Sequence, residues 1–406
     1  MSPLAPRSPD SKASPTMDAP PPQQTIRAAI VQPALPKYRI PVFQELARRP
    51  GIELRVCYGK RGDLPNVEAE GFPAEATAMW RPTLLGQHAL WHPAQYTEAV
   101  AKKCDVVVLN WTPRYLTLLP ALLRAKRQGV ATVLWGHGYS KKERAWWRGI
   151  RRSTGSLADC LLFYDEQTAK QYLEEGWSPE QVFVAPNALD QAPIESARSW
   201  WLGEPGGLEE FRRREGAPEG PFVLFVSRLH ADNRLDLLVQ ALAEPALRAR
   251  RVTAVIIGNG PEERARISAF AGQLGVHDQV LFRDGLYEEK LLAPWFLTAT
   301  AFCYPQNIGL SLLHSFGYGL PVITSDNRAC QNPEIAAFES GVNGLAYQHG
   351  SAKDMARAIL ELIDEPDLRD RLGEEALRTA RQRFTIPRMV DGIEIAMRSA
   401  LHRSRR

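Results

Sequence analysis

The sequence lacks the patterns that identify several common protein classes. Its five cysteines form no C-x-x-C pair, it contains no H-E-x-x-H or G-x-S-x-G motif, and no apolar run approaches the roughly 18 to 20 residues that span a bilayer. These absences argue against a disulfide scaffold, a metal site and a serine hydrolase. The first residues also lack the apolar core of a signal peptide, so we expect a cytoplasmic chain, soluble or peripheral at a membrane, with reduced thiols.

The composition favours a globular protein with two cored domains. The chain has 406 residues, of which 44% are hydrophobic and 24% charged, and a formal net charge of +4. This weak positive charge favours anionic small molecules or a membrane surface over nucleic acid. Residues 1–25 are rich in Pro and Ser and nearly free of large apolar residues, so we expect them to be disordered.

Short β-branched runs alternate with amphipathic helical segments twice along the chain. The first series lies in residues 26–190 and the second in residues 221–385, and the segment between them is rich in Gly, Pro and charge. Such alternation predicts parallel sheets with helical crossovers. We therefore predict an α/β protein with two Rossmann-like, doubly wound parallel-sheet domains that face a cleft. Residues 191–220 would form a linker with an insertion, and residues 386–406 a C-terminal helix that packs back toward the first domain.

Two strand-to-helix turns of the second domain could carry chemistry. In "FVSRLHADNRLDLLVQAL", Arg228 stands at the strand exit and Arg234 at the helix entry, where guanidinium groups can hold a diphosphate. An equally weighted alternative is that both arginines only solvate a loop. In "IIGNGPEERA", Gly258 and Gly260 make a tight turn, but glutamates follow where a G-x-G-x-x-G motif would continue, which argues against a nicotinamide dinucleotide.

The first domain offers three further candidates. His137 lies between glycines just past an apolar strand, where its side chain can reach a cleft or can have no role. The segment "KKERAWWRGIRR" combines basic residues with Trp146 and Trp147, which suits an anionic membrane face as well as a solvated helix with two core tryptophans. Lys37 stands with Tyr38 and Arg39 at the first strand-to-helix turn, where they could bind an anionic acceptor or, equally, serve only as charge at the helix entry.

Residues 304–324, "YPQNIGLSLLHSFGYGLPVIT", contain no Asp, Glu, Lys or Arg, yet carry His314 among apolar residues. The segment divides into a strand end, a turn at residues 307–309 and a helix that carries His314 about one turn in. Glycine at such a turn permits close approach of a phosphate, and free backbone N–H groups can bind it.

Five segments of the second domain together resemble the retaining GT-B glycosyltransferases of family 4, the glycosyl transferases group 1. They are "FVSRL", "IIGNGPE", "VLFRDGLYEEKLL", "NIGLSLLHSFGYGLPVIT" and "NPEIAAFESGVNGLAY". The first domain, with "YRIPVF", "WGHG", "CLLFYDE" and "APNALD", is similar to a family 4 acceptor domain. The resemblance implies a metal-independent enzyme without cofactor that transfers a sugar from a UDP- or GDP-linked donor to an acceptor hydroxyl, with retention of configuration. Residues 26–190 would then bind the acceptor and residues 221–385 the donor.

The resemblance also implies roles for single residues. Arg228 matches the arginine that holds the diphosphate, His137 the histidine that faces the donor sugar, and Gly309 with Leu310 the phosphate-facing helix start, while Glu334 is expected to be structural. The family lysine is replaced by Asn233, and Arg234 could substitute for it. The paired glutamates are replaced by Gln306 and His314, which could hold a sugar and a ribose hydroxyl, because a neutral imidazole both donates and accepts hydrogen bonds. The full expected site comprises catalytic His137, Arg228 and Arg234, and donor-binding Ser227, Asn233, Gly258, Gln306, Asn307, Ile308, Gly309, Leu310 and His314.

Three functional hypotheses follow besides a minor nicotinamide-dependent oxidoreductase alternative. The first is an active glycosyltransferase in cell-surface polysaccharide or glycoconjugate assembly, with a glycan or lipid-linked acceptor and, as a further partner, the anionic inner face of the plasma membrane. The second is a catalytically degenerate paralogue that binds a nucleotide sugar and acts as an interaction subunit, a hypothesis motivated by Asn233, Gln306 and His314. The third is a sugar-nucleotide epimerase with the same two domains.

Overall fold

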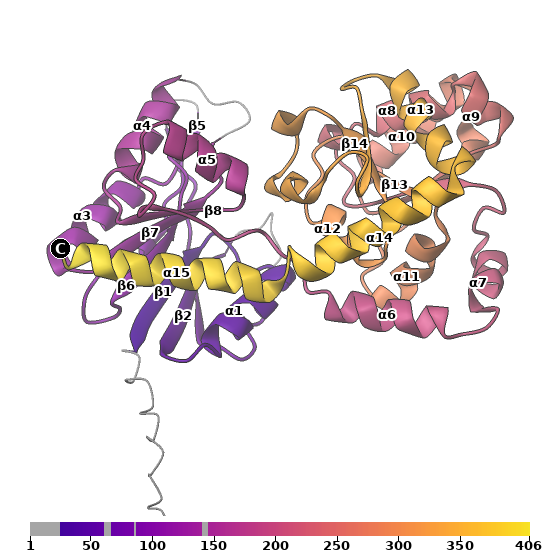
Figure 1. Cartoon of the computed structure of the whole chain (residues 1–406). Helices are drawn as coiled ribbons and strands as arrows, with labels where there is room; N and C mark the ends of the chain where they lie inside the picture. The colour runs from indigo at the N-terminus through magenta and orange to yellow at the C-terminus, as the bar shows by residue number, and fades with distance from the viewer. Residues whose placement is uncertain (1–24, 61–65, 85–86, 140–144) are drawn as a thin grey trace, which may run out of the picture.

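The computed structural model describes residues 25–60, 66–84, 87–139 and 145–406, so the N-terminal tail that we expect to be disordered lies almost wholly outside the described residues. The chain folds into two α/β domains that lie side by side (Figure 1). Each is built on a parallel sheet, which confirms the predicted fold class.

The N-terminal domain has a seven-stranded sheet in the order β3-β2-β1-β6-β7-β8-β9. In β1, alternate residues enter two cores: Ala28 and Ile30 face the core covered by α1 and the C-terminal helix α15, and Ala29 and Val31 face the core covered by α3 and α5. The strands are β1 (Ile26–Gln32), β2 (Ile52–Gly59), β3 (Ala74–Thr77), β6 (Val106–Asn110), β7 (Ala131–Gly136), β8 (Cys160–Phe163) and β9 (Val182–Val184), with a small hairpin of β4 (Thr83–Leu84) and β5 (Gln87–His88). The helices are α1 (Ile40–Ala47), α2 (Pro93–Glu98), α3 (Leu118–Gln128), α4 (Ala145–Gly155) and α5 (Glu166–Glu174), with a 3-10 turn at Lys37–Arg39.

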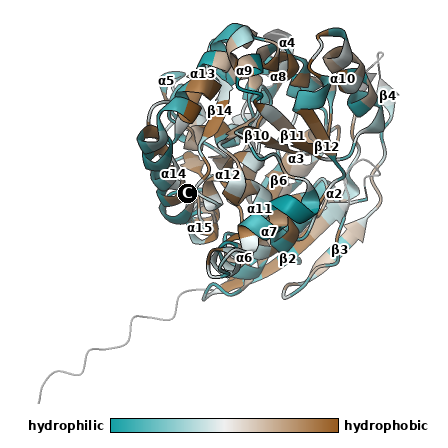
Figure 2. Ribbon diagram, turned by 90° about the vertical axis from the view of Figure 1, so that its right-hand side faces the viewer, coloured by the Kyte–Doolittle hydropathy of each residue, from teal (hydrophilic) through white to brown (hydrophobic). Residues whose placement is uncertain are grey.

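The C-terminal domain has a six-stranded sheet in the order β12-β11-β10-β13-β14-β15. Its two central strands, β10 and β13, contain only apolar residues and are almost fully buried, and Figure 2 shows β10 and β11 as hydrophobic. The strands are β10 (Phe222–Val226), β11 (Thr253–Ile257), β12 (Val280–Arg283), β13 (Ala301–Cys303), β14 (Val322–Ser325) and β15 (Gly344–Tyr347). The helices are α8 (Leu235–Leu242), α9 (Pro245–Ala249), α10 (Pro261–Gln273), α11 (Glu289–Thr298), α12 (Ser311–Gly317), α13 (Ala352–Asp364) and α14 (Pro366–Gln382), with 3-10 turns at Ala231–Asn233, His277–Gln279, Arg328–Cys330 and Pro333–Ala337.

The segment 191–220, which we expected to be a linker with an insertion, instead forms α6 (Ala192–Leu202) and α7 (Gly207–Glu215). Ile194, Ala197 and Trp201 recur at helical spacing and join the core of the C-terminal domain, where Trp201 packs edge-on against Phe211 of α7. The Gly, Pro and charge that suggested a linker belong to the short turn between these helices, to the loop after α7 and to the outer faces of both helices.

The last helix, α15 (Ile386–Ser404), runs back along the N-terminal domain (Figure 1). Met389, Ile393 and Met397 are fully buried in the same core as α1 and the central strands. At Gly392 a Cβ atom would lie 2.1 Å from the carbonyl oxygen of Val184, so this glycine lets the helix approach β9 closely. The chain therefore crosses between the domains twice, once before α6 and once before α15.

All five cysteines are free, and Cys57, Cys104, Cys160 and Cys303 are buried. Burial is the main reason that the pKa of Cys57 rises to about 12, and the same holds for Cys104 and Cys160. These thiols are therefore inert packing residues. No helix in the described part of the chain is both long and apolar enough to cross a membrane.

Buried His92 predicts acid sensitivity of the N-terminal domain. The residue is 1% exposed, and burial lowers its pKa to about 4. The unfolded chain takes up a proton near pH 6.5 while the folded chain does not, so stability is complete above pH 6.5 and falls as the pH is lowered toward 4. We expect His92→Gln to abolish up to about 3 kcal/mol of this pH-dependent loss. Urea unfolding of both proteins at several pH values checks this, and parallel profiles would contradict it.

Candidate functional site

The carboxyl ends of β10 and β13 bring two of the expected segments together. Because these strands are neighbours, Ser227 and Arg228 after β10 lie next to the turn that precedes α12. The Ser311 hydroxyl at the start of α12 donates to the carbonyl oxygen of Val226 at 3.2 Å, and the Tyr304 hydroxyl donates to Ser227 Oγ at 3.2 Å. The sheet edge thus fixes the arginine loop against the turn at residues 307–309.

Arg228 is exposed and makes no hydrogen bond or ion pair to any described residue. Burial raises the pKa of the nearby Tyr304 phenol, and the Ser227 hydrogen bond and the positive charge of Arg228 only partly offset that rise. The guanidinium group therefore lies close to the strand ends and keeps all its donors for a ligand. The diphosphate-binding role expected for Arg228 from the sequence stays a prediction.

The turn before α12 presents backbone donors. Among the described residues, the N–H groups of Gly309 and Leu310 have no hydrogen-bond partner, whereas the N–H of Ile308 donates to the buried Gln331 Oε1 at 2.9 Å. Asn307 adopts a left-handed conformation with φ 66°, and its carbonyl oxygen accepts from Asn332 Nδ2 at 3.0 Å. Gly309 and Leu310 are thus available to an anion, while the Ile308 amide, which we expected to contribute, is already used.

Asn233 and Arg234 differ from their expected roles. Asn233 is 2% exposed, and its carboxamide accepts from the His230 N–H at 2.7 Å and donates to the Tyr304 hydroxyl at 2.9 Å. Asn233 therefore stabilises the loop from its buried side, and its carboxamide does not face a ligand. Arg234 adopts a left-handed conformation with φ 56°, and its Nη2 lies 2.9 Å from a carboxylate oxygen of Asp236. The positive charge that we expected to replace the family lysine is thus paired with Asp236 in the first turn of α8.

The glycines at the next turn also serve packing. A Cβ atom at Gly258 would lie 1.8 Å from the carbonyl oxygen of Ser227, and one at Gly260 would lie 2.5 Å from that of Leu229. The turn after β11 therefore presses directly on the arginine loop. Gly258, which we expected in the donor site, thus packs against the backbone of Ser227, and there is no space for a ligand between the two.

His137 and Glu334 lie where the two domains meet. The exposed His137 follows β7 with its ring 5.0 Å from that of Tyr164. The negative charge of Glu334 adds to the burial that raises the pKa of Tyr164, so the carboxylate lies near this aromatic pair. Glu334 Oε1 accepts from Asn187 Nδ2 of the other domain at 2.6 Å. A Cβ atom at Gly309 would lie 3.8 Å from Glu334 Oε2, so the Glu334 carboxyl group lies between the Gly309 turn and Asn187 of the N-terminal domain.

Gln306 and His314, the positions of the missing glutamates, have different surroundings. Gln306 is half-buried and makes no hydrogen bond to a described residue. His314 Nε2 lies 2.8 Å from Glu289 Oε2, and the imidazole also packs against Phe296 at 4.8 Å. Sequence reasoning did not single out Glu289, because its partner is 25 residues away and only the fold brings them together.

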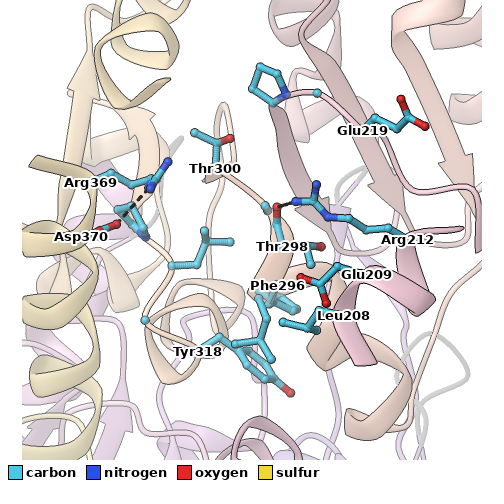
Figure 3. A pocket seen from close by; sticks show the side chains of 17 residues that line it. Leu208, Glu209, Arg212, Glu219, Phe296, Thr298, Thr300, Tyr318, Arg369 and Asp370 are labelled. Carbon is cyan, nitrogen blue, oxygen red and sulfur yellow. Dashed lines mark hydrogen bonds and ion pairs between the residues drawn. The ribbon is translucent and has the colours of Figure 1, made fainter. Parts of the chain in front are cut away.

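A cavity of about 700 Å³ lies at the opposite edge of the C-terminal sheet (Figure 3). It is lined by Pro221, Thr300 and Pro321, which directly precede β10, β13 and β14. Arg212 Nη2 donates to the carbonyl oxygen of Thr298 at 3.0 Å there. This cavity lies at the amino ends of the strands, so it does not contact Arg228 or the Gly309 turn at their carboxyl ends. Among the described residues, no group of His, Cys, Asp or Glu could hold a metal ion.

Comparisons with known proteins agree with this geometry. Residues 208–379 match the family model described as Glycosyl transferases group 1. A D-inositol 3-phosphate glycosyltransferase of Thermomonospora curvata is 31% identical over 242 residues, which cover 55% of this chain and 53% of the relative. The chain thus spans about half the length of the curated relatives it matches.

Two solved structures match nearly the whole chain. Anabaena Alr3699/HepE in complex with UDP has a TM-score of 0.69 at 17% identity, with 92% of this chain and 99% of that chain covered. A glycosyltransferase from Rickettsia africae has a TM-score of 0.68 at 14% identity, with 93% and 99% covered. The two sheets and the crossing helix α15 therefore form a GT-B fold.

Proposed function

We propose, from the match of residues 208–379 to the Glycosyl transferases group 1 model and from the GT-B fold, that this protein is a retaining glycosyltransferase. It transfers a sugar from a nucleotide diphosphate sugar to an acceptor hydroxyl in the assembly of a cell-surface polysaccharide or related glycoconjugate. One observation carries the proposal: Arg228, which makes no hydrogen bond or ion pair to a described residue, and the unbonded N–H groups of Gly309 and Leu310 follow the carboxyl ends of the neighbouring strands β10 and β13.

The chemistry assigned to these residues is stabilisation of the leaving group. As the bond between the anomeric carbon and the diphosphate breaks, negative charge develops on the phosphate oxygens, and Arg228 with the two N–H groups stabilises it. The acceptor oxygen then bonds to the anomeric carbon on the same face, and its proton passes to a phosphate oxygen. His137 faces the sugar from the other domain, and Gln306 holds a sugar hydroxyl.

UDP is the first nucleotide to test, since Alr3699/HepE was solved in complex with UDP. Thermal shift with a panel of UDP- and GDP-linked sugars identifies the donor, because a bound donor raises the apparent stability by mass action. Release of UDP or GDP from the selected donor then measures turnover. We expect a shift with one donor and slow hydrolysis of it without acceptor. Absence of both across the panel would reject the proposal.

A degenerate paralogue remains the second candidate function, favoured by one specific observation. Arg234, the cation offered in place of the family lysine, is held by Asp236 at 2.9 Å. A protein of this kind would bind the donor, giving a thermal shift, but would release no nucleotide with any acceptor. The same two assays therefore separate the two functions.

We further propose that the N-terminal domain binds an anionic membrane, where a lipid-linked acceptor would be located. Residues 106–158 contain ten Lys or Arg and a single acid, Glu143. Six of the sixteen exposed large apolar side chains of the described chain lie in these same residues 106–158, so exposed apolar side chains and positive charge occur in one segment. Trp146 is 50% exposed and stacks on Trp147, which argues against two core tryptophans in α4. The neighbouring residues 140–144 lie outside the described part of the chain.

The exposed apolar side chains continue from α4 toward α2 and α3. Leu116, which precedes α3, is 39% exposed, and Leu119 and Leu123 of α3 are 45% and 40% exposed. The guanidinium of Arg124 lies 4.3 Å above the ring of exposed Tyr96 in α2. The Leu116 N–H donates to the carbonyl oxygen of Leu90, next to exposed Trp91. Leucines and aromatic rings with basic neighbours suit the interface of an anionic bilayer.

Vesicle sedimentation tests the membrane proposal. We expect binding to phosphatidylcholine vesicles only when phosphatidylglycerol is included, and weaker binding at high salt. The double variant Leu119→Glu/Leu123→Glu should reduce binding by about tenfold or more, because it removes apolar contact and adds repelled charge. Leu202→Glu, at an equally exposed leucine of α6, is the matched control and should bind like wild type. Salt-independent binding, or equal loss in both variants, would contradict the proposal.

A further inference from the structure

A row of side chains crosses the centre of the N-terminal sheet near its carboxyl edge. Asn110, the last residue of β6, pairs in register with Trp135 of β7. The register of β1 with β6 places Gln32, the last residue of β1, on the other side of Asn110. Residues of one register row point to the same face of a sheet. Since Trp135 joins the core covered by α1 and α15, Gln32 points to that face too.

The strand order of this sheet reverses beside Gln32. From β1 the chain continues outward to β2 and β3, and it then returns to β6 on the opposite side of β1. Ligands of doubly wound sheets bind at the carboxyl ends of the strands at such a reversal. The row therefore lies where the topology predicts a ligand.

The two ends of the row carry buried hydrogen-bond donors that have no acceptor. Gln32 is 5% exposed, and Trp135 is fully buried. Neither Gln32 Nε2 nor Trp135 Nε1 has a hydrogen-bond partner among the described residues. Buried polar groups in folded proteins are nearly always paired, so these two donors indicate an acceptor that the described chain does not supply.

Arg39 adds a buried positive charge above the row. It is 5% exposed, and its guanidinium carbon lies 4.8 Å from the centre of the Trp135 ring. The guanidinium forms no ion pair with a described residue. Its hydrogen-bond contacts are weak, at 3.6 Å from Nη1 to Met389 Sδ and 3.4 Å from Nη2 to the Tyr164 hydroxyl. Arginine stays charged when buried, and a buried charge is costly unless it is paired. The aromatic rings offset part of this cost but supply no negative charge.

We propose that Arg39, Gln32 and Trp135 bind an oxyanion, a carboxylate or phosphate group, and that the acceptor carries this group. An oxyanion has only acceptor atoms, which match a set of donors, whereas a sugar hydroxyl would bring a donor of its own. The assignment of the group to the acceptor rests on the proposed function.

The surroundings of Arg39 place the site on the side of the N-terminal domain that faces the C-terminal domain. Tyr164, which contacts Arg39, packs with its ring 5.0 Å from that of His137. The pKa of Glu289 in α11 is raised by burial and lowered by its neighbours, among them the positive charge of Lys37. The turn at Lys37–Arg39 therefore lies near the C-terminal domain, to which the expected diphosphate site belongs.

Binding of inorganic phosphate tests the site. Calorimetry at constant ionic strength compares wild type with Arg39→Met and Gln32→Leu, whose new side chains are of similar size but lack the charge and the amide donor. We expect saturable binding by wild type, about tenfold or more weaker binding by Arg39→Met and a smaller loss in Gln32→Leu. Gln32→Leu alone decides the question if Arg39→Met does not fold. Arg48→Met, at an exposed arginine that follows α1, is the matched control and should bind like wild type.

Thermal unfolding separates ligand binding from packing. Without phosphate, Arg39→Met should unfold at the same temperature as wild type or higher, because it loses a buried charge that has no partner in the free protein. Added phosphate should then raise the unfolding temperature of wild type more than that of the variant. A variant that is less stable than wild type and binds phosphate equally well would assign Arg39 to packing. A wild type that binds no phosphate would also overturn the site.

Kinetics decide whether the oxyanion belongs to the acceptor. Phosphate should compete with the acceptor in wild type, and Arg39→Met should abolish this competition and raise the acceptor KM by about tenfold or more with the donor KM unchanged. Phosphate that does not compete with the acceptor would assign the site to a free anion and overturn this part of the inference. A wild type that transfers no sugar would reject the proposed function, while the phosphate measurements would still decide on the site.

Discussion

Arg228→Ala is expected to lower turnover of the nucleotide-sugar donor by about tenfold or more while the protein stays folded. A hydrogen bond between a charged donor and a phosphate contributes about 1.5 to 3 kcal/mol, which corresponds to about tenfold to a hundredfold in rate if it forms in the transition state. Arg228 is exposed and has no partner among the described residues, so its removal breaks no internal contact.

The size of this effect depends on where the negative charge develops. The positive charge of Arg228 acts to lower the pKa of Tyr304, so Arg228 lies near this phenol. The helix start after the Gly309 turn contacts the same strand end through the hydrogen bond from the Ser311 hydroxyl to Val226. In the proposed function this guanidinium contacts the leaving diphosphate and not the acceptor. We therefore expect kcat to fall more than the acceptor KM rises.

Arg213→Ala provides the control for Arg228→Ala. Arg213 is an exposed arginine of α7, away from the carboxyl ends of the strands, and its loss changes the net charge by the same amount. Steady-state kinetics of both variants with the donor identified by thermal shift decide the matter. Equal kinetics for Arg228→Ala and wild type would remove Arg228 from the site.

The parts of the fold that local sequence patterns determine could be predicted. Apolar runs such as Ile26–Gln32 became central strands, and Gly129 ends α3 in a left-handed conformation with φ 66°, as a helix-stopping glycine should. The segment 191–220 was misjudged because Ile194, Ala197 and Trp201 recur over only two turns, and the turn glycines around Gly206 outweighed them. What decided their structure was burial against distant residues, for example the hydrogen bond from Trp201 Nε1 to the Lys290 carbonyl oxygen at 2.8 Å.

The candidate site divides in the same way. The position of Arg228 and of the Gly309 turn at one edge of the sheet could be predicted, because each follows a recognisable strand and parallel strands end at one edge of a sheet. Three contacts that occupy expected site groups could not be predicted from the sequence. They join the Ile308 amide to Gln331, Arg234 to Asp236, and His314 to Glu289. The contacts of Ile308 and His314 join segments that are more than 20 residues apart in the sequence. The contact of Arg234 depends on its left-handed backbone conformation, which local patterns rarely predict.

Gly309→Ala is expected to reduce donor affinity and Gly258→Ala to reduce stability, although both change a glycine beside the same site. At Gly309 a Cβ atom would meet nothing closer than Asn332 Nδ2 at 3.3 Å, and the backbone is not left-handed. The variant should therefore fold with nearly unchanged stability. The added methyl group stands beside the free N–H groups of residues 309 and 310, so it should keep a phosphate away and reduce donor affinity by about tenfold or more.

At Gly258 the same methyl group would lie 1.8 Å from the Ser227 carbonyl oxygen, a distance that no rotamer relieves because both atoms are fixed by the backbone. The β11 turn or the arginine loop must move, and we expect a loss of about 3 kcal/mol or more in the free energy of unfolding. Urea unfolding and donor calorimetry on both variants measure the contrast. If Gly309→Ala bound donor like wild type, the diphosphate could not lie against that turn, and Arg228 would have to bind it from the opposite side of its loop.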